Sequence, residues 1–84
     1  NTSLTAYPNP FHHSTNIEFS LEKTTWVQID VYNVIGEKVD VIYQADLPAG
    51  THTLNYQAAD LANGIYFIKL QAGNTITTTK LLKN

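Results

Sequence analysis

Three histidines are the first candidates for chemistry in this chain of 84 residues, because imidazole nitrogens are common ligands of transition metals. His12 and His13 are adjacent, and an extended backbone points neighbouring side chains to opposite faces, so their rings do not converge. His52 is distant in sequence, no acidic residue stands at a suitable spacing beside His12, and cysteine is absent. Because a metal site needs three or four converging ligands, we expect none and interpret the histidines as solvated residues.

Hydrolytic chemistry has equally little support in the sequence. A serine nucleophile requires a sharp turn beside a histidine and an acid, and Ser3, Ser14 and Ser20 have no such setting. Glycoside hydrolysis requires two carboxyl groups at a fixed separation, one of them buried so that its pKa rises. We instead expect every acidic residue to lie on a solvated outer face or in a turn. These residues are Glu18, Glu22, Asp30, Glu37, Asp40, Asp46 and Asp60. We therefore expect no catalytic residue and no cofactor, and a protein that is not an enzyme.

Two aromatic residues provide a minor binding hypothesis. Trp26 and Tyr32 fall on the polar face of the strand expected at 25–33, with Gln28 and Asp30 between them. Aromatic rings offer flat apolar faces on which sugar rings stack, and nearby polar groups bond to hydroxyls. Alternatively, the two rings cover the flank of the domain, or Trp26 caps the core. The binding hypothesis and these structural alternatives stay open. Sugar stacking would make this a carbohydrate-binding domain appended to a secreted hydrolase.

Charge and composition exclude two further classes of function. The chain has five Lys, no Arg and seven acidic residues, for a formal net charge of -2, whereas nucleic-acid binding favours a basic stripe rich in Arg. No run of about 18 apolar residues is present, so we expect no membrane span. The length fits one domain, residues 1–84. The chain lacks an initiating Met and a signal-peptide pattern, so we expect it to be a piece of a longer protein or a mature product.

Short β-strands are the elements that must position these residues. Apolar and polar residues alternate with a period of two, and no window of a dozen residues carries a helical stripe. Pro8 and Pro10 interrupt the pattern near the start, and Gly36 and Gly50 mark turns. The expected strands are 4–7, 16–21, 25–33, 38–44, 51–57, 65–72 and 75–82. Seven strands with turn signals every eight to twelve residues or so predict an all-β fold, a seven-stranded, antiparallel, immunoglobulin-like β-sandwich.

The alternation also groups side chains on a common face of each strand. The strands at 25–33 and 38–44 form the clearest hairpin, around a turn at 34–37. The segment 58–64 is too short to count as a helix. The residues expected to share a face are Ile17, Phe19 and Leu21; Val27, Ile29 and Val31; Val39, Val41 and Tyr43; His52, Leu54 and Tyr56; Tyr66, Ile68 and Leu70.

One motif sharpens the sandwich prediction. Leu61, Gly64 and Tyr66 have the Leu-x-x-Gly-x-Tyr spacing of a tyrosine corner, in which a tyrosine near the start of the sixth strand bonds to upstream backbone. A buried phenol without a partner costs about 1–3 kcal/mol, so we expect the Tyr66 hydroxyl to find one. This role is structural.

A series of short motifs then occurs in order along nearly the whole chain. They are Tyr-Pro-Asn-Pro-Phe at 7–11, Ile-Glu-Phe at 17–19, Val-Tyr-Asn-Val-Ile-Gly at 31–36, Leu-Pro-Ala-Gly-Thr-His at 47–52, Leu-Ala-Asn-Gly-Ile-Tyr-Phe-Ile-Lys at 61–69 and Lys-Leu-Leu-Lys at 80–83. Together they resemble the C-terminal sorting domain of the type IX (Por) secretion system of Bacteroidetes. The immunoglobulin-like domain of the flagellar hook-capping protein is similar over the same segments. A structural or spacer module is therefore the alternative.

The resemblance implies a function and a set of partners. Such a domain comes last in a secreted protein, behind a Sec signal peptide and a cargo domain, and folds in the periplasm. The outer-membrane translocon reads it, and a sortase-like cysteine peptidase removes it and attaches the cargo to the cell surface. The resemblance maps the signal to Gly64, Tyr66, Lys80 and Lys83. The scissile bond would lie near or before Asn1, and Lys83-Asn84 resembles a natural terminus.

The final strand is the segment we expect the translocon to contact. A strand at the edge of a sheet offers unpaired N–H and C=O groups for strand addition. A terminal strand is also the easiest to detach and pair again. We therefore expect residues 75–82 to carry recognition together with the adjacent sixth strand.

Overall fold

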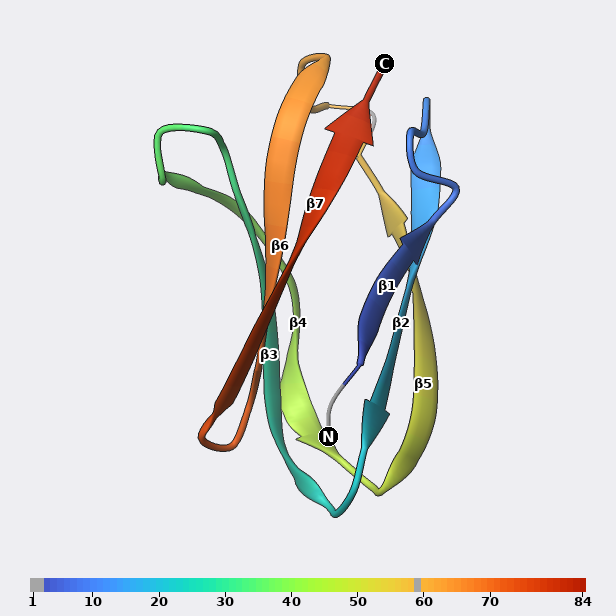
Figure 1. The fold of residues 1–84 in the computed structure, drawn as a ribbon, viewed down its shortest axis with the longest axis vertical. Coiled ribbons are helices and arrows are strands. Elements are labelled where there is room, and N and C mark those ends of the chain that lie inside the picture. The colour runs from blue at the N-terminus through green and yellow to red at the C-terminus, as the bar shows by residue number, and fades with distance from the viewer. Residues whose placement is uncertain (1–2, 59) are drawn as a thin grey trace.

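The computed structural model describes residues 3–58 and 60–84, which form two antiparallel sheets packed face to face (Figure 1). The predicted all-β, seven-stranded sandwich is confirmed. The strands are β1 (Leu4–Tyr7), β2 (Ser14–Leu21), β3 (Thr25–Tyr32), β4 (Lys38–Leu47), β5 (Gly50–Gln57), β6 (Gly64–Ala72) and β7 (Thr75–Lys83). Within the described residues, no helix is long and apolar enough to cross a membrane.

The strands divide into a three-stranded sheet A and a four-stranded sheet B. Sheet A has the order β1-β2-β5, and sheet B has the order β4-β3-β6-β7. In the constant-type immunoglobulin arrangement the fourth strand pairs within the first sheet; here β4 pairs with β3 instead. The four edge strands are therefore β1, β5, β4 and β7, and the last strand of the chain borders sheet B.

The core fills the space between the inner faces of the two sheets. Its completely enclosed side chains include Ile17 and Phe19 from sheet A and Ile29, Ile68 and Leu81 from sheet B. Strict alternation of buried and more exposed positions along β2 and β6 produces this core, because a strand directs successive side chains to opposite faces. The shared faces predicted for β2, β3, β5 and β6 are confirmed, and they are the faces that pack into the core.

The shared face predicted for Val39, Val41 and Tyr43 on β4 is wrong. Val39 and Val41 are 39% and 41% exposed. The pairing with β3 shifts twice: Ile29 faces Tyr43 but Asp30 faces Val41, and a second shift follows Val31. Each shift places an extra residue in β4 and reverses the face of the side chains beyond it. As a result Ile42 and Tyr43 both pack partly against the core.

Candidate functional site

Tyr66 fixes the loop that leads into β6. Its ring is buried, and its hydroxyl donates to the backbone carbonyl of Ala62 at 2.6 Å. Leu61 packs partly against the core beside it, and Gly64, with φ of 153°, begins the strand. This is the form of a tyrosine corner. Only 8% of Tyr66 is exposed, so this residue affects the surface of the domain through the loop that it positions.

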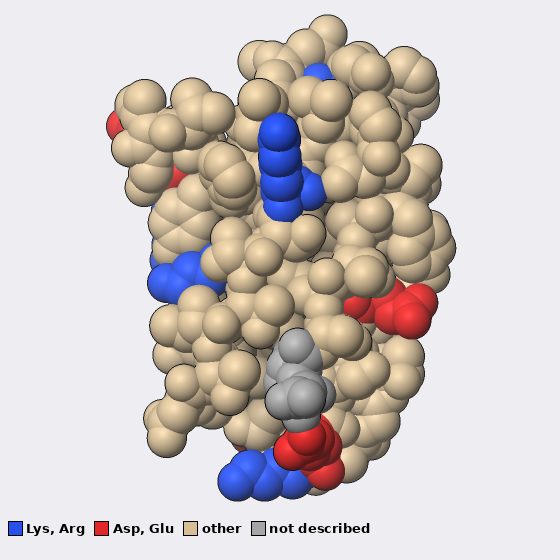
Figure 2. Space-filling model, viewed as in Figure 1, with Lys and Arg blue, Asp and Glu red and all other residues tan. Residues whose placement is uncertain are grey.

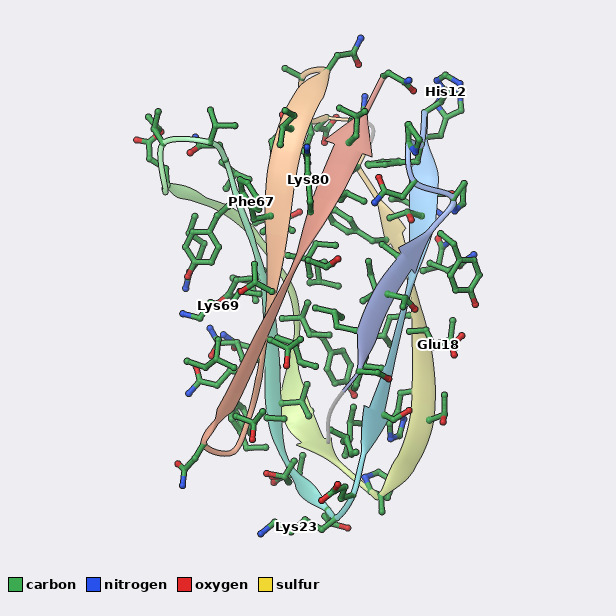
Figure 3. All side chains as sticks on the ribbon, in the orientation of Figure 1. His12, Glu18, Lys23, Phe67, Lys69 and Lys80 are labelled. Carbon is green, nitrogen blue, oxygen red and sulfur yellow. The ribbon has the colours of Figure 1, made fainter. Side chains whose placement is uncertain are left out.

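Lys80 and Lys83 lie on opposite faces of β7. They are three positions apart, and a strand with a period of two must place such residues on different faces. Lys80 is exposed on the outer face of sheet B (Figure 3). Lys83 is 8% exposed, pairs across the ladder with Gly64, and its Nζ lies 3.5 Å from Asn63 Oδ1. The two lysines do not form one basic patch.

The side chain of Asn9 covers part of the free edge of β7. Its Nδ2 donates to the Lys80 carbonyl at 2.8 Å, and its Oδ1 accepts from the Leu82 amide at 2.9 Å. The amide thus makes the two hydrogen bonds that a neighbouring strand would make there. It replaces a strand at this point of the edge.

The backbone of Phe11 continues this cover to the end of the chain. Its amide donates to the Leu82 carbonyl at 3.0 Å, and its carbonyl accepts from the Asn84 amide at 2.9 Å. The Phe11 ring is buried in the core, and His12 Nδ1 donates to the Asn84 carbonyl at 2.6 Å. The segment 9–12 therefore holds the C-terminal half of the β7 edge, from Lys80 to Asn84.

The other half of the β7 edge carries no such cover. Lys80, Leu82 and Asn84 direct their backbone groups to the edge, so the same parity applies to Ile76 and Thr78. Outside the strand ladders, the described residues make no backbone hydrogen bond to Ile76 or Thr78. These two residues mark the part of the edge that is open to another strand.

The turn predicted at 34–37, between β3 and β4, is confirmed, but the exposure of its apolar residues was not anticipated. Val34 is 66% exposed and Ile35 75%, although both are apolar. Asn33 organises this turn, because its Oδ1 accepts from the amides of Ile35 at 3.1 Å and Glu37 at 2.9 Å. An asparagine at the start of a short turn is the signal that predicts this arrangement. The hairpin end, defined as residues 33–37, stands away from the body of the sandwich (Figure 1).

Asp30 is buried, which corrects the expectation of a solvated carboxylate. It is 4% exposed and lies on β3, which has a neighbouring strand on each side in sheet B. Gln28 Nε2 donates to both of its oxygens, at 3.1 and 3.0 Å, and Lys38 Nζ lies 3.6 Å from Oδ2. Strands on both sides and the long side chains around it exclude water, and this pairing compensates the buried charge.

The histidines occupy three different settings. His12 and His13 are exposed, whereas His52 is half-buried and stacks on Phe19 with ring centroids 5.5 Å apart. The expectation that His52 is simply solvated is therefore wrong; its ring covers an enclosed core residue. Within residues 3–58 and 60–84, no group of three His, Cys, Asp or Glu is arranged to hold a metal ion.

Trp26 and Tyr32 do not form one stacking platform. They lie six residues apart on β3, which corresponds to about 20 Å at the rise of a strand. Trp26 is 47% exposed, so it does not cap the core. Lys69 Nζ lies 5.6 Å from the centroid of the Tyr32 ring, over one face of it. Sugar stacking at these residues stays a prediction.

A hydrogen bond between tyrosine and aspartate joins the two sheets. The hydroxyl of Tyr56 on β5 donates to Asp40 Oδ2 on β4 at 2.8 Å. Burial raises the pKa of the Tyr56 phenol, and the neighbouring Asp40 carboxylate raises that pKa further. Both effects disfavour the phenolate, so the bond is stable at neutral pH.

Two facing antiparallel sheets, a tyrosine-fixed loop and a C-terminal edge strand define an immunoglobulin-like β-sandwich domain. Among known families, the secretion system C-terminal sorting domain matches residues 5–84, and the chain belongs to this family. No curated protein matches the chain. Membership gives the domain the role of a secretion signal of the Por, or type IX, system. It implies interaction with that secretion machinery and a cargo that is secreted or placed on the cell surface.

Proposed function

We propose that the type IX translocon reads this domain in its folded state and thereby carries an upstream cargo domain of the same chain across the outer membrane. The observation that carries the proposal is the family match over residues 5–84. The domain acts as a binding module without catalysis, after folding in the periplasm. A sortase-like cysteine peptidase then separates the domain from the cargo, which is attached to the cell surface.

The four residues that the resemblance assigns to the signal have different parts in this proposal. Gly64 and Tyr66 shape the loop before β6, because the ring is buried and its hydroxyl holds Ala62. Lys80 is exposed and contacts the translocon directly. Lys83 orders the last residues of β7 against the loop through Asn63.

The open half of the β7 edge is the proposed site of strand addition. An extended segment of the translocon pairs with the backbone groups near Ile76 and Thr78, where no other strand competes. Asn9 and Phe11 protect the rest of the edge, which limits pairing with unrelated chains.

A reporter fusion tests the proposed function. Residues 1–84 are fused behind a reporter with a Sec signal and expressed in a type IX-competent strain and in a translocon-deficient derivative. We expect the reporter outside the outer membrane only in the competent strain. Retention in the periplasm of both strains, with the domain folded, contradicts the proposal and favours a structural or spacer module.

A truncation tests the role of the last strand. Deletion of residues 80–84 removes Lys80, Lys83 and the partners of Asn9 and Phe11. We expect export to fall to the level of the translocon-deficient strain. Unchanged export of the truncated fusion would remove residues 80–84 from the signal without affecting the family assignment.

A further inference from the structure

A row of four side chains crosses the outer face of sheet B. Lys38 on β4 pairs with Tyr32 on β3, Tyr32 pairs with Phe67 on β6, and Phe67 pairs with Lys80 on β7. Paired residues on neighbouring strands share a face, so the row places two aromatic rings between two ammonium groups. Lys69, two residues along β6 from Phe67, lies on the same face with its Nζ over the Tyr32 ring.

This row concentrates positive charge on one face of a protein whose formal net charge is -2. Three of the five lysines, Lys38, Lys69 and Lys80, lie on this face. Lys38 Nζ forms an ion pair with Asp30 Oδ2 at 3.6 Å. In the described part of the chain, no carboxylate forms an ion pair with Lys69 or Lys80. Figure 3 shows Phe67, Lys69 and Lys80 on the sheet B side of the sandwich and Glu18 on the sheet A side, and Figure 2 shows uncharged surface between the charged groups of this view.

We propose that the outer face of sheet B, at Tyr32, Phe67, Lys69 and Lys80, binds an acidic surface of a partner protein. Charge complementarity specifies the partner: carboxylates facing Lys69 and Lys80, and an apolar side chain facing Phe67. The row spans three strand spacings, about 14 Å, which suits a protein surface rather than a single small anion. This inference rests on the proposed function, because it assigns the face to the translocon component that recognises the domain.

The shape of the face favours a protein over an anionic bilayer. Tyr32 and Phe67 are only partly exposed, so no ring projects as a wedge into an acyl layer. The net charge of -2 gives the whole domain no long-range attraction to a negative membrane. A partner protein needs only the local match of charge and apolar surface that this row offers.

Charge reversal at Lys69 tests the inference, since Lys69 is not among the residues that the resemblance assigns to the signal. In the reporter fusion, we expect Lys69→Glu to lower export at least about tenfold, because two acidic surfaces then meet. Lys23→Glu is the matched control, in the turn between β2 and β3 at the lower end of the molecule in Figure 3, away from Lys69 and Lys80. We expect this control to leave export unchanged.

Lys69→Met addresses folding, because Lys69 pairs with Asp30 across the ladder and Lys69→Glu places like charges opposite each other. Lys69→Met keeps the apolar stem and removes only the charge, and we expect it to lower export several-fold at an unchanged urea midpoint. Export of both variants at the level of Lys23→Glu overturns the inference. Failure of the unmodified fusion to leave the periplasm is a different result, which contradicts the proposed function itself.

Two further measurements separate the protein partner from the other occupants of this face. In the first, the domain is sedimented with vesicles of phosphatidylglycerol or phosphatidylcholine. Binding to phosphatidylglycerol alone, if Lys69→Glu abolished it, would assign the face to anionic lipid and overturn the inference. A dimer in sedimentation velocity that Lys69→Glu dissociates would assign it to a second copy and overturn it as well. A monomer that ignores both vesicles, together with the export defect, supports the acidic partner protein.

Discussion

Tyr56 and Tyr66 show how single hydroxyl groups determine local structure in this small domain. Both rings are buried, but their hydroxyls bond to different partners: a carboxylate for Tyr56 and a backbone carbonyl for Tyr66. The first bond joins β4 of sheet B to β5 of sheet A. The second closes the loop before β6. A buried phenol that lost its partner would destabilise the fold, so both residues can be tested by removing one oxygen atom.

Tyr66→Phe removes the bond to Ala62 and keeps the packing of the ring. We expect the free energy of unfolding to fall by about 1 kcal/mol, the net contribution of one hydrogen bond. Urea unfolding followed by Trp26 fluorescence measures the change. Tyr43→Phe is the matched control, because within residues 3–58 and 60–84 the structure gives the Tyr43 hydroxyl no hydrogen-bond partner. An equal loss in both variants would contradict a specific role for the Tyr66 hydroxyl.

Tyr56 gives the domain a dependence on alkaline pH. Its pKa in the folded state lies above the ordinary value of 10.0, because of burial and the Asp40 carboxylate. Such a group contributes stability that is complete below about pH 10 and declines as the pH rises above that value. We expect the urea midpoint of the unmodified protein to fall between about pH 10 and 12, and that of Tyr56→Phe to fall less relative to its own value at pH 8. Parallel curves for the two proteins would refute this account.

At the scale of the elements, the cover on β7 couples two distant parts of the chain. Asn9 and Leu82 are 73 residues apart in sequence, yet one amide group makes two bonds to the edge of the last strand. The segment before β2 therefore stabilises the strand that ends the fold. Edge strands attract unrelated chains, and this cover shortens the exposed part of the edge.

Replacement of Asn9 by alanine tests this coupling. We expect Asn9→Ala to lower the free energy of unfolding by about 1–2 kcal/mol, since two hydrogen bonds are lost. Hydrogen exchange at the Leu82 amide should accelerate about 5- to 30-fold, because that amide loses its acceptor. Asn55→Ala, which removes one exposed bond to Asn16, should change Leu82 exchange little. Equal exchange at Leu82 in both variants would show that the cover contributes nothing.

Alternation predicted the strands well and the irregular positions poorly. The faces of β2 and β6 follow from side chains that alternate without interruption. The two shifts in β4 have no mark in the sequence, because Val39 and Val41 fit an inward face as well as an outward one. Likewise, the burial of Asp30 depends on Gln28 and Lys38, whose positions only the assembled sheet determines.

The site was predictable to a different extent at each residue. The spacing of Leu61, Gly64 and Tyr66 is local, so the hydroxyl bond to upstream backbone could be anticipated. The opposite faces of Lys80 and Lys83 follow from their spacing, although the resemblance assigns both lysines to the signal. The contact of Asn9 with β7 joins opposite ends of the chain, and no local pattern reports it.

At the scale of the whole molecule, one core holds both sheets and the proposed signal together. A domain of this size has a free energy of unfolding of about 4–13 kcal/mol, at roughly 0.05–0.15 kcal/mol per residue. Leu81 is completely enclosed, although it lies on the last edge strand. Its side chain therefore links the strand proposed for recognition to the stability of the entire fold.

Leu81→Ala tests whether export requires the folded domain. We expect a loss of about 2–5 kcal/mol, which is a large part of the total, and a parallel loss of reporter export. Val39→Ala on β4 is the control; Val39 is 39% exposed, so the expected change in stability is within about 0.5 kcal/mol. Thermal unfolding of the purified chain and reporter location are the two measurements. Full export of an unfolded Leu81→Ala fusion would contradict recognition of a folded surface.

The direction of the first and last strands has a mechanical consequence. β1 begins in the lower half of the molecule in Figure 1, whereas β7 finishes near the top, beside the start of β6. Leu4, the first residue of β1, therefore lies in the half of the molecule away from the end of β7. We expect secretion machinery that binds near the end of β7 to contact the domain away from the start of β1. Large and small cargo proteins should then leave the surface near the end of β7 equally accessible.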